Sequence, residues 1–383
     1  MESIKSFTVT NLPRVIFGEG KFSELHNIIQ SYGHRALVIT GAESLKKSGK
    51  YDDLTLRLKQ SNIEYNSISV QGEPTTELVD AVTGDCRRIP INVVAAIGGG
   101  SVIDCGKAVA AMLTENGSVK DYLEGVGSRK PSGKKVPFIA VPTTAGTGSE
   151  ATKNAVICNR KEGFKKSLRH DAYMPDVAII DPELTRNLPR YITISCGLDA
   201  VSQLIESYTS LKTNVFIDSL VSKAISLASE SLLPLSFDKG EDMSLRGKMS
   251  YAALISGISL SHAGLGTVHG LAGPLGGLFP APHGIVCGKL LFPIMTFTIK
   301  KIIDENNLPA QKRFADIGRL MTGDASHDNV ACCRQFLNVL NKWTQAVKLP
   351  QLSCFGMNSA HIEKAISLAD NKNSPVKLSR EEM

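Results

Sequence analysis

Continuous apolar runs alternate with amphipathic stretches over the first half of the chain. The apolar runs at 36–40, 92–97, 137–141 and 177–180 are typical of strands buried in a parallel sheet. A short strand with a turn is predicted at 12–20, and a further strand at 65–70. Helical spacing of apolar residues predicts helices at 21–32, 51–61 and 74–88. Strands that alternate with helices predict a doubly wound α/β sheet.

After Pro182 the strand-like runs nearly vanish, and the apolar residues take helical spacing. The predicted helices span 194–210, 217–233, 245–260, 284–297, 309–320, 329–343 and 359–368. We therefore expect two domains, an α/β domain at 1–181 and an all-α domain at 182–383. No low-complexity linker separates them, so we expect the two domains to share a tight cleft.

A glycine turn follows the predicted strand at 92–97. The turn is Gly98-Gly99-Gly100-Ser101, and an alanine-rich helix follows it to about residue 113. Glycines let a phosphate approach the backbone, and the free N–H groups at a helix start face the anion. Ser101 and Asp104 match a capping box. The structural alternative is a tight connection without a ligand.

A second loop rich in hydroxyl groups follows the strand at 137–141. Its sequence is PTTAGTGSE at 142–150, and Thr143, Thr144, Thr147 and Ser149 offer hydroxyl donors. Ligands of open α/β sheets bind at the carboxyl ends of strands. Two such loops predict a site for a diphosphate and a ribose, with a solvated loop as the alternative.

The stretch from 261 to 286 contains His269 and His283 among many glycines and no charged residue. This setting favours a metal or substrate site over a glycine-rich helix contact with hydrogen-bonded core histidines. Asp199 and Gln203 are four residues apart, so they share one face of a predicted helix. They could add two oxygen ligands, or they could form a solvated polar face.

Composition narrows the class of protein. The 383 residues are 42% hydrophobic and 21% charged, and the net charge of +6 is scattered in separate lysine pairs. A nucleic-acid-binding face needs a clustered basic stripe, so this charge suits an anionic cofactor better. The eight cysteines form no CxxC pair, and neither a signal sequence nor a membrane-spanning apolar run is present. We therefore expect a cytoplasmic enzyme with reduced thiols and no membrane partner.

Taken together, GGGSVIDCGK at 98–107, PTTAGTGSE at 142–150 and the His-Gly steps at 269 and 283 resemble the iron-containing alcohol dehydrogenases. This family belongs to a superfamily with glycerol dehydrogenase and dehydroquinate synthase. The resemblance implies a Rossmann-like N-terminal domain, a helical C-terminal domain and an active site in the cleft between them. It also implies a nicotinamide dinucleotide, a divalent metal such as Fe²⁺ or Zn²⁺, and a homodimer or larger homo-oligomer.

The resemblance also implies roles for individual residues. The metal ligands fall on Asp199, Gln203, His269 and His283, the two histidines also serving the reaction. Lys165 aligns with a lysine near the nicotinamide ribose, where it would serve both catalysis and cofactor binding.

Three positions depart from the family pattern. Gln203 stands where the family has a metal-binding histidine, which implies looser binding, a different metal or none. Gly273 stands where many members carry a further histidine, a role that His262 could take over. Gly41 follows the first buried strand, where NAD-preferring members have aspartate, so NADP and NAD both stay open; Glu43 would repel the extra phosphate of NADP.

The predicted function is the interconversion of a small-molecule alcohol and its aldehyde or ketone by hydride transfer with NAD or NADP. Two alternatives use the same fold. One is a metal-free reductase of a carboxylated carbonyl compound, like maleylacetate reductase. The other is a lyase or cyclase like dehydroquinate synthase. A non-catalytic dinucleotide sensor is a third alternative, from a different class of function.

Overall fold

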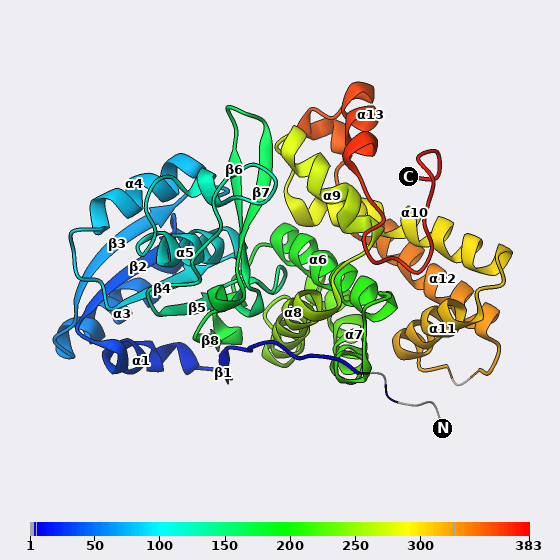
Figure 1. Ribbon diagram of the computed structural model, residues 1–383. Helices are drawn as coiled ribbons and strands as arrows, with labels where there is room; N and C mark the ends of the chain where they lie inside the picture. Colours follow the sequence, from blue (N-terminus) through cyan, green and yellow to red (C-terminus); the bar gives the residue numbers. More distant parts are fainter. Residues whose placement is uncertain (1–3, 5, 325) are drawn as a thin grey trace. The chain divides into compact units, whose positions relative to one another are not determined.

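The computed structural model describes residue 4 and residues 6–324 and 326–383, which form two compact units (Figure 1). The α/β unit contains residues 10–144 and 148–185. The helical unit contains residues 6–9, 145–147 and 186–383. Among the described helices, none has both the length and the apolar character that crossing a bilayer requires.

The α/β unit is built on one six-stranded parallel sheet, as the apolar runs predict. The strand order is β1-β8-β5-β4-β2-β3, and every pairing in it is parallel. The strands β4 and β5 are buried along their whole length, which explains their continuous apolar sequences. The strands are β1 (Arg14–Phe17), β2 (Arg35–Gly41), β3 (Glu64–Val70), β4 (Val93–Gly98), β5 (Phe138–Pro142) and β8 (Val177–Ile180).

Helices cover both faces of this sheet. Successive side chains of a strand point to opposite faces, so Leu37 and Val94 join one apolar core and Val38 and Ala95 join the other. The first core includes α4 (Thr76–Cys86) and α5 (Gly100–Met112). The second includes α1 (Leu25–Tyr32) and α3 (Lys50–Gln60). The short segments of this unit are α2 (Ser44–Lys47), η1 (Lys21–Glu24), η2 (Val119–Tyr122), η3 (Ser149–Ala151), η4 (Asp171–Tyr173) and η5 (Pro182–Thr185).

Two local features of the α/β unit differ from the sequence-based expectations. The capping box is wrong, because α5 begins two residues earlier than a helix capped by Ser101 would, with Gly99 as N-cap and no side-chain cap. An antiparallel hairpin of β6 (Asn154–Asn159) and β7 (Phe164–Arg169) was not predicted. The second strand, FKKSLR, carries too few apolar residues to signal a strand by itself, and its pairing with β6 stabilises it.

The helical unit is organised around α6 (Arg190–Thr209), which is buried on nearly every side after its first turn. The helices α7, α8 and α10 all pack against it. Pairs of neighbouring helices, α11 with α12 and α9 with α13, complete the unit (Figure 1). The other elements are α7 (Val215–Ser236), α8 (Met243–Ala263), α9 (Thr267–Leu278), α10 (His283–Asp304), α11 (Leu308–Thr322), α12 (Asn329–Val347), η6 (Leu352–Phe355) and α13 (Ser359–Leu368).

The helix α9 was not predicted, because its sequence TVHGLAGPLGGL contains four glycines and a proline. These residues disfavour an isolated helix. For Gly270, packing explains why glycine is required. A Cβ atom on Gly270 would lie 1.8 Å from the carbonyl oxygen of Asp370, so only glycine allows this close approach.

Candidate active site

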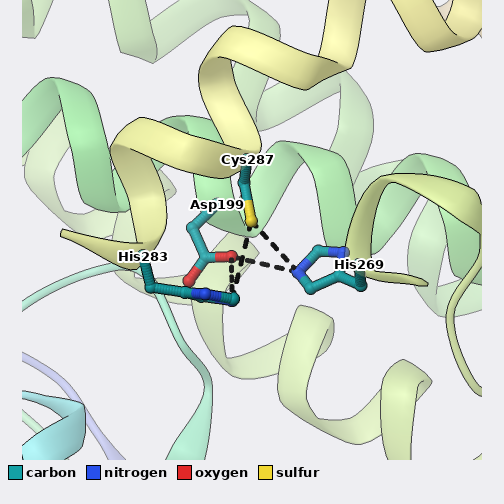
Figure 2. Close-up of side chains that lie close together, drawn as sticks. All are labelled: Asp199, His269, His283 and Cys287. Atoms are coloured by element: carbon teal, nitrogen blue, oxygen red, sulfur yellow. Dashed lines mark hydrogen bonds and ion pairs between the residues drawn. The ribbon is translucent and has the colours of Figure 1, made fainter. Parts of the chain in front are cut away.

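Four side chains of the helical unit converge on one point (Figure 2). Asp199, His269, His283 and Cys287 each offer one donor atom, and these atoms all lie within 4.8 Å of one another. His269 Nε2 lies 3.2 Å from Asp199 Oδ1, and His283 Nε2 lies 4.0 Å from the same oxygen. The Sγ atom of Cys287 lies 3.6 Å from the Nε2 atom of each histidine.

The local structure of α10 brings two of these donors together. The helix begins at His283 directly after Pro282, so Cys287 lies one turn further on the same face. A Cβ atom on Gly284 would lie 2.1 Å from the carbonyl oxygen of Ser195 on α6. Glycine at 284 therefore allows α10 to pack closely on α6, next to Asp199.

Glu206 fixes the orientation of His269. This buried carboxylate accepts from His269 Nδ1 at 2.6 Å through Oε2, and its Oε1 accepts from the backbone N–H of Val268 at 2.6 Å. A carboxylate can only accept, so the ring hydrogen is on Nδ1 and Nε2 is directed at the cluster. This is the carboxylate–histidine arrangement that positions metal ligands in proteins.

The donor cluster is buried except on the side of His283, which is more exposed to solvent. The side chains of Asp199 and His269 are only 2% and 5% exposed, whereas that of His283 is 31% exposed. Burial by itself raises the pKa of Asp199. The hydrogen bond from His269, the charge of His283 and the nearby amide of Gln203 outweigh that effect, so the pKa is below its usual value. The carboxylate is therefore ready to bind a cation.

The two other titrating groups respond to the same burial. Burial lowers the pKa of His269, but Cys287, Glu206 and Asp199 together raise it well above the ordinary value for histidine. Burial raises the pKa of the Cys287 thiol to about 11.

Gln203 lies next to the cluster, one turn after Asp199. Its Oε1 atom accepts from the Ser256 hydroxyl at 2.7 Å. Ser256 belongs to the helical unit, and Gln203 is 4% exposed.

The donor set fits a divalent metal. It combines a carboxylate oxygen, two imidazole nitrogens and a sulfur, the atom types that bind Zn²⁺ and related ions. The outer carboxylate of Glu206 completes the arrangement expected around a bound metal.

In the α/β unit, the predicted loops meet at one edge of the sheet. The chain leaves β2 toward β3 on one side, and β4 lies on the other side of β2. Ligands of open α/β sheets bind at such a switch point, outside the carboxyl ends of the strands. Gly41 ends β2, Gly98 ends β4, and Thr143 follows β5 with its N–H donated to the Gly98 carbonyl at 2.9 Å.

The two predicted loop residues Asp104 and Ser149 are engaged with each other. The Ser149 hydroxyl donates to Asp104, which also accepts from the Val156 N–H at 3.0 Å. Lys107 is buried and donates to the Ser149 carbonyl at 2.8 Å and to Thr152 Oγ1 at 2.9 Å. In this structure, these side chains fasten the hydroxyl-rich loop to α5.

Comparisons with known proteins agree with this architecture. The family model for iron-containing alcohol dehydrogenase matches residues 13–182, and the model for the C-terminal part of the Fe-containing alcohol dehydrogenase family matches residues 193–383. The probable alcohol dehydrogenase EutG of Escherichia coli is 33% identical over 94% of this chain and 87% of its own length. The long-chain-alcohol dehydrogenase 1 of Geobacillus thermodenitrificans is 31% identical over 92% of this chain and 89% of its own length.

A solved structure has the same fold over its whole length. A mutant of an archaeal halo-thermophilic Red Sea brine pool alcohol dehydrogenase superposes with a TM-score of 0.89 at 26% identity, covering 99% of this chain and 98% of the other.

The chain belongs to the iron-containing alcohol dehydrogenase family.

This membership confirms the resemblance, the fold class and the enzyme class inferred from the motifs. The protein is an NAD(P)-dependent oxidoreductase that interconverts an alcohol and its carbonyl compound, and membership in this family implies a divalent metal. The comparisons favour neither the metal-free reductase nor the lyase alternative.

Sequence reasoning missed two residues in or next to this donor cluster. Glu206 is seven residues after Asp199, so helical spacing alone places it on the same face. Cys287 is four residues after His283, a signal hidden because the helix was predicted to begin at residue 284.

Two further predicted residues have partners of their own. Lys165, on β7, forms an ion pair with Glu73. His262, on the last turn of α8, has its Nδ1 atom 2.7 Å from the Ile258 carbonyl oxygen.

Proposed function

We propose that this enzyme interconverts a primary alcohol and its aldehyde, with a divalent metal held by Asp199, His269 and His283. The observation that carries the proposal is the convergence of these three donors in a buried site. The names of the relatives, a probable alcohol dehydrogenase and a long-chain-alcohol dehydrogenase, support this substrate class. A divalent metal at these donors supplies Lewis-acid polarisation of the substrate oxygen.

The side chains of the chain have distinct tasks in this proposal. Asp199 contributes negative charge that offsets the charge of the metal. Glu206 holds the ring of His269 with Nε2 facing the cluster. His283 is the most exposed of the three ligands, so we place the substrate on its side of the cluster. His262 stays a candidate for proton transfer.

We place the dinucleotide at the switch point of the parallel sheet, between the carboxyl ends of β2 and β4. The diphosphate would lie at the N-terminus of α5, where backbone N–H groups favour an anion. Nicotinamide cofactors accept or deliver the hydride, and the protein supplies their orientation. The contacts that we propose come from Gly41, Gly98, Gly99, Gly100, Ser101, Thr143, Thr144, Thr147 and Lys165, with Asp104 and Ser149 holding the loop.

We propose NADP as the preferred cofactor. Gly41 puts no carboxylate at the end of β2, and Glu43 forms an ion pair with Lys47. This pairing moderates the repulsion that Glu43 would exert on a 2′-phosphate. A homodimer or larger assembly and a cytoplasmic location stay predictions from the sequence.

The test is aldehyde reduction by the full-length enzyme with NADPH or NADH, before and after metal removal with a chelator. We expect activity that is lost on chelation, restored by added metal, and absent in His269→Ala. His327→Ala is a matched control, because His327 is an exposed histidine of the same unit. Full activity in chelated protein or in His269→Ala would refute the metal site.

A further inference from the structure

The fourth protein donor of the site is a separate question. With Asp199, His269 and His283 as three ligands, two neighbouring side chains could supply another donor atom. These are Gln203, which stands where the family pattern has a histidine, and Cys287, which the motifs do not mark.

The hydrogen bonds of Gln203 use its amide for other purposes. Its Oε1 atom already accepts from the Ser256 hydroxyl at 2.7 Å. The remaining polar atom of its side chain is the amide nitrogen, whose N–H groups can only donate, so this nitrogen is not a metal donor. The one atom of Gln203 that could bind a metal is therefore already engaged by Ser256.

The position of Cys287 suits direct ligation. Its Sγ atom lies 3.6 Å from His269 Nε2 and 3.6 Å from His283 Nε2. With Zn–S bonds of about 2.3 Å and Zn–N bonds of about 2.0–2.1 Å, the N···S edge of a tetrahedral site is about 3.6 Å. The distance from Asp199 Oδ1 to His269 Nε2, 3.2 Å, is close to the N···O edge of about 3.3 Å expected for the same bond lengths, whereas the distance to His283 Nε2, 4.0 Å, is longer than this edge.

The helix that carries Cys287, α10, is held in place by its packing. Cys287 lies one turn after His283 on the same face of α10, and the close approach of α10 to α6 depends on Gly284. The Cys287 side chain is fully buried, and its sulfur contacts both histidine ligands.

We propose that Cys287, and not Gln203, is the fourth protein donor, and that it makes this site select Zn²⁺ over Fe²⁺. A metal–sulfur bond forms as the thiol proton leaves to solvent, with no change in oxidation state. A thiolate is a soft ligand that favours Zn²⁺, whereas an amide oxygen is a hard ligand that suits Mg²⁺ or Mn²⁺. The inference rests on the proposed metal-dependent function and gives that site its selectivity.

The opposing interpretation is that the Cys287 thiol only forms weak hydrogen bonds with the two imidazoles. Cobalt substitution separates the two interpretations, since a thiolate bound to Co²⁺ gives a near-ultraviolet sulfur-to-cobalt charge-transfer band. We expect this band in the metal-depleted full-length protein after titration with Co²⁺. It should be absent in Cys287→Ser and present in Cys333→Ser, a control thiol buried in α12 of the same unit.

Affinity and selectivity give a second readout. Loss of an outer partner of a metal ligand costs about 10- to 100-fold in affinity, so loss of a direct ligand in Cys287→Ser should weaken Zn²⁺ binding by at least about 100-fold. We expect Gln203→Ala to change the affinity for Zn²⁺ by less than about tenfold. In anaerobic competition, the ratio of Zn²⁺ affinity to Fe²⁺ affinity should be at least about tenfold higher in the wild type than in Cys287→Ser, and an equal ratio in the two proteins would overturn the claim of selectivity.

Zinc-edge X-ray absorption of the wild type covers the case in which Cys287→Ser does not fold. A sulfur neighbour at about 2.3 Å is expected, and a fit with only nitrogen and oxygen neighbours overturns the inference. A cobalt band that survives in folded Cys287→Ser overturns it too. Active aldehyde reduction without a metal–sulfur bond would refute this inference alone, and a metal–sulfur bond in an enzyme that reduces no aldehyde would refute the proposed function alone.

Discussion

Glu206 offers the sharpest test of how this site is held together. The substitution Glu206→Gln keeps the shape of the side chain and removes its charge. One oxygen can still accept from His269 Nδ1, which is 2.6 Å from the present carboxylate. The NH₂ group then faces the N–H of Val268, so a buried hydrogen bond at 2.6 Å is replaced by two opposed donors.

The magnitude follows from these two contacts. A buried donor left without an acceptor costs about 1–3 kcal/mol, which should appear in the free energy of unfolding of the metal-free protein. Replacing the outer partner of a metal-binding histidine costs about 10- to 100-fold in metal affinity or activity, or roughly 1.4–2.7 kcal/mol. The loss should fall mainly on kcat and on metal affinity, because Glu206 contacts His269 and not the substrate side of the cluster.

The assay combines three measurements on wild type and Glu206→Gln. They are the metal dissociation constant by chelator competition, kcat and KM for aldehyde reduction, and urea unfolding with and without metal. Glu230→Gln is the matched control, because Glu230 is an exposed residue of α7 whose ion pair with Lys248 is screened by solvent and contributes little to stability. A Glu206→Gln enzyme that binds metal and turns over like wild type, while losing only unfolding free energy, would refute the positioning role.

Three further predictions concern other parts of the molecule. Gly270→Ala places a Cβ atom 1.8 Å from the Asp370 carbonyl oxygen, so α9 must shift. We expect urea unfolding to show a loss of about 1–3 kcal/mol in the free energy of unfolding, together with weaker metal binding. Wild-type values of both quantities would contradict the packing argument. Gly41→Asp is sterically possible, since the added Cβ would lie no closer than 3.8 Å to any neighbouring side chain. The ratio of kcat/KM with NAD to kcat/KM with NADP should rise at least about tenfold, because the new carboxylate would bind the ribose diol of NAD. An unchanged ratio would show that the ribose does not bind at the end of β2. Burial raises the pKa of Glu150 to about 7 from 4.5, so the folded protein binds this proton more tightly than the unfolded chain does. The free energy of unfolding should therefore fall by up to about 3 kcal/mol as pH rises from about 4.5 to about 7. Glu150→Gln should flatten this part of the stability profile, and a profile identical to that of the wild type would show that Glu150 does not cause the fall.

The sheet and most helices could be predicted, because burial leaves a direct trace in the sequence. A strand such as β4 is covered on both faces and is apolar at each position, and the amphipathic helices follow the period of 3.6 residues. The helix α9 left no such trace. Its glycines report contacts with residues far along the chain, as the approach of Gly270 to Asp370 shows, and local propensity contains no information on those contacts.

The site was predictable to the extent that its residues belong to motifs. Asp199, His269 and His283 were named from the sequence, and the structure brings them together. Cys287 was not named, because it shares a helix face with His283 only if the helix already includes His283. Helix starts are the least certain feature of a pattern, and here a proline at 282 places the start at His283.

The capping box shows the opposite error. Ser101 and Asp104 have the right spacing, but Asp104 instead accepts from the Ser149 hydroxyl and the Val156 N–H. Local spacing cannot reveal that a carboxylate has better partners some fifty residues away in the chain.

Anomalous diffraction from crystals of the metal-loaded full-length enzyme, recorded at the absorption edge of the metal, tests the central claim most directly. We predict one strong peak in the helical unit, within bonding distance of the Asp199 carboxylate and of the Nε2 atoms of His269 and His283. A peak elsewhere in the chain, or none at these three side chains in crystals of active enzyme, would contradict the account.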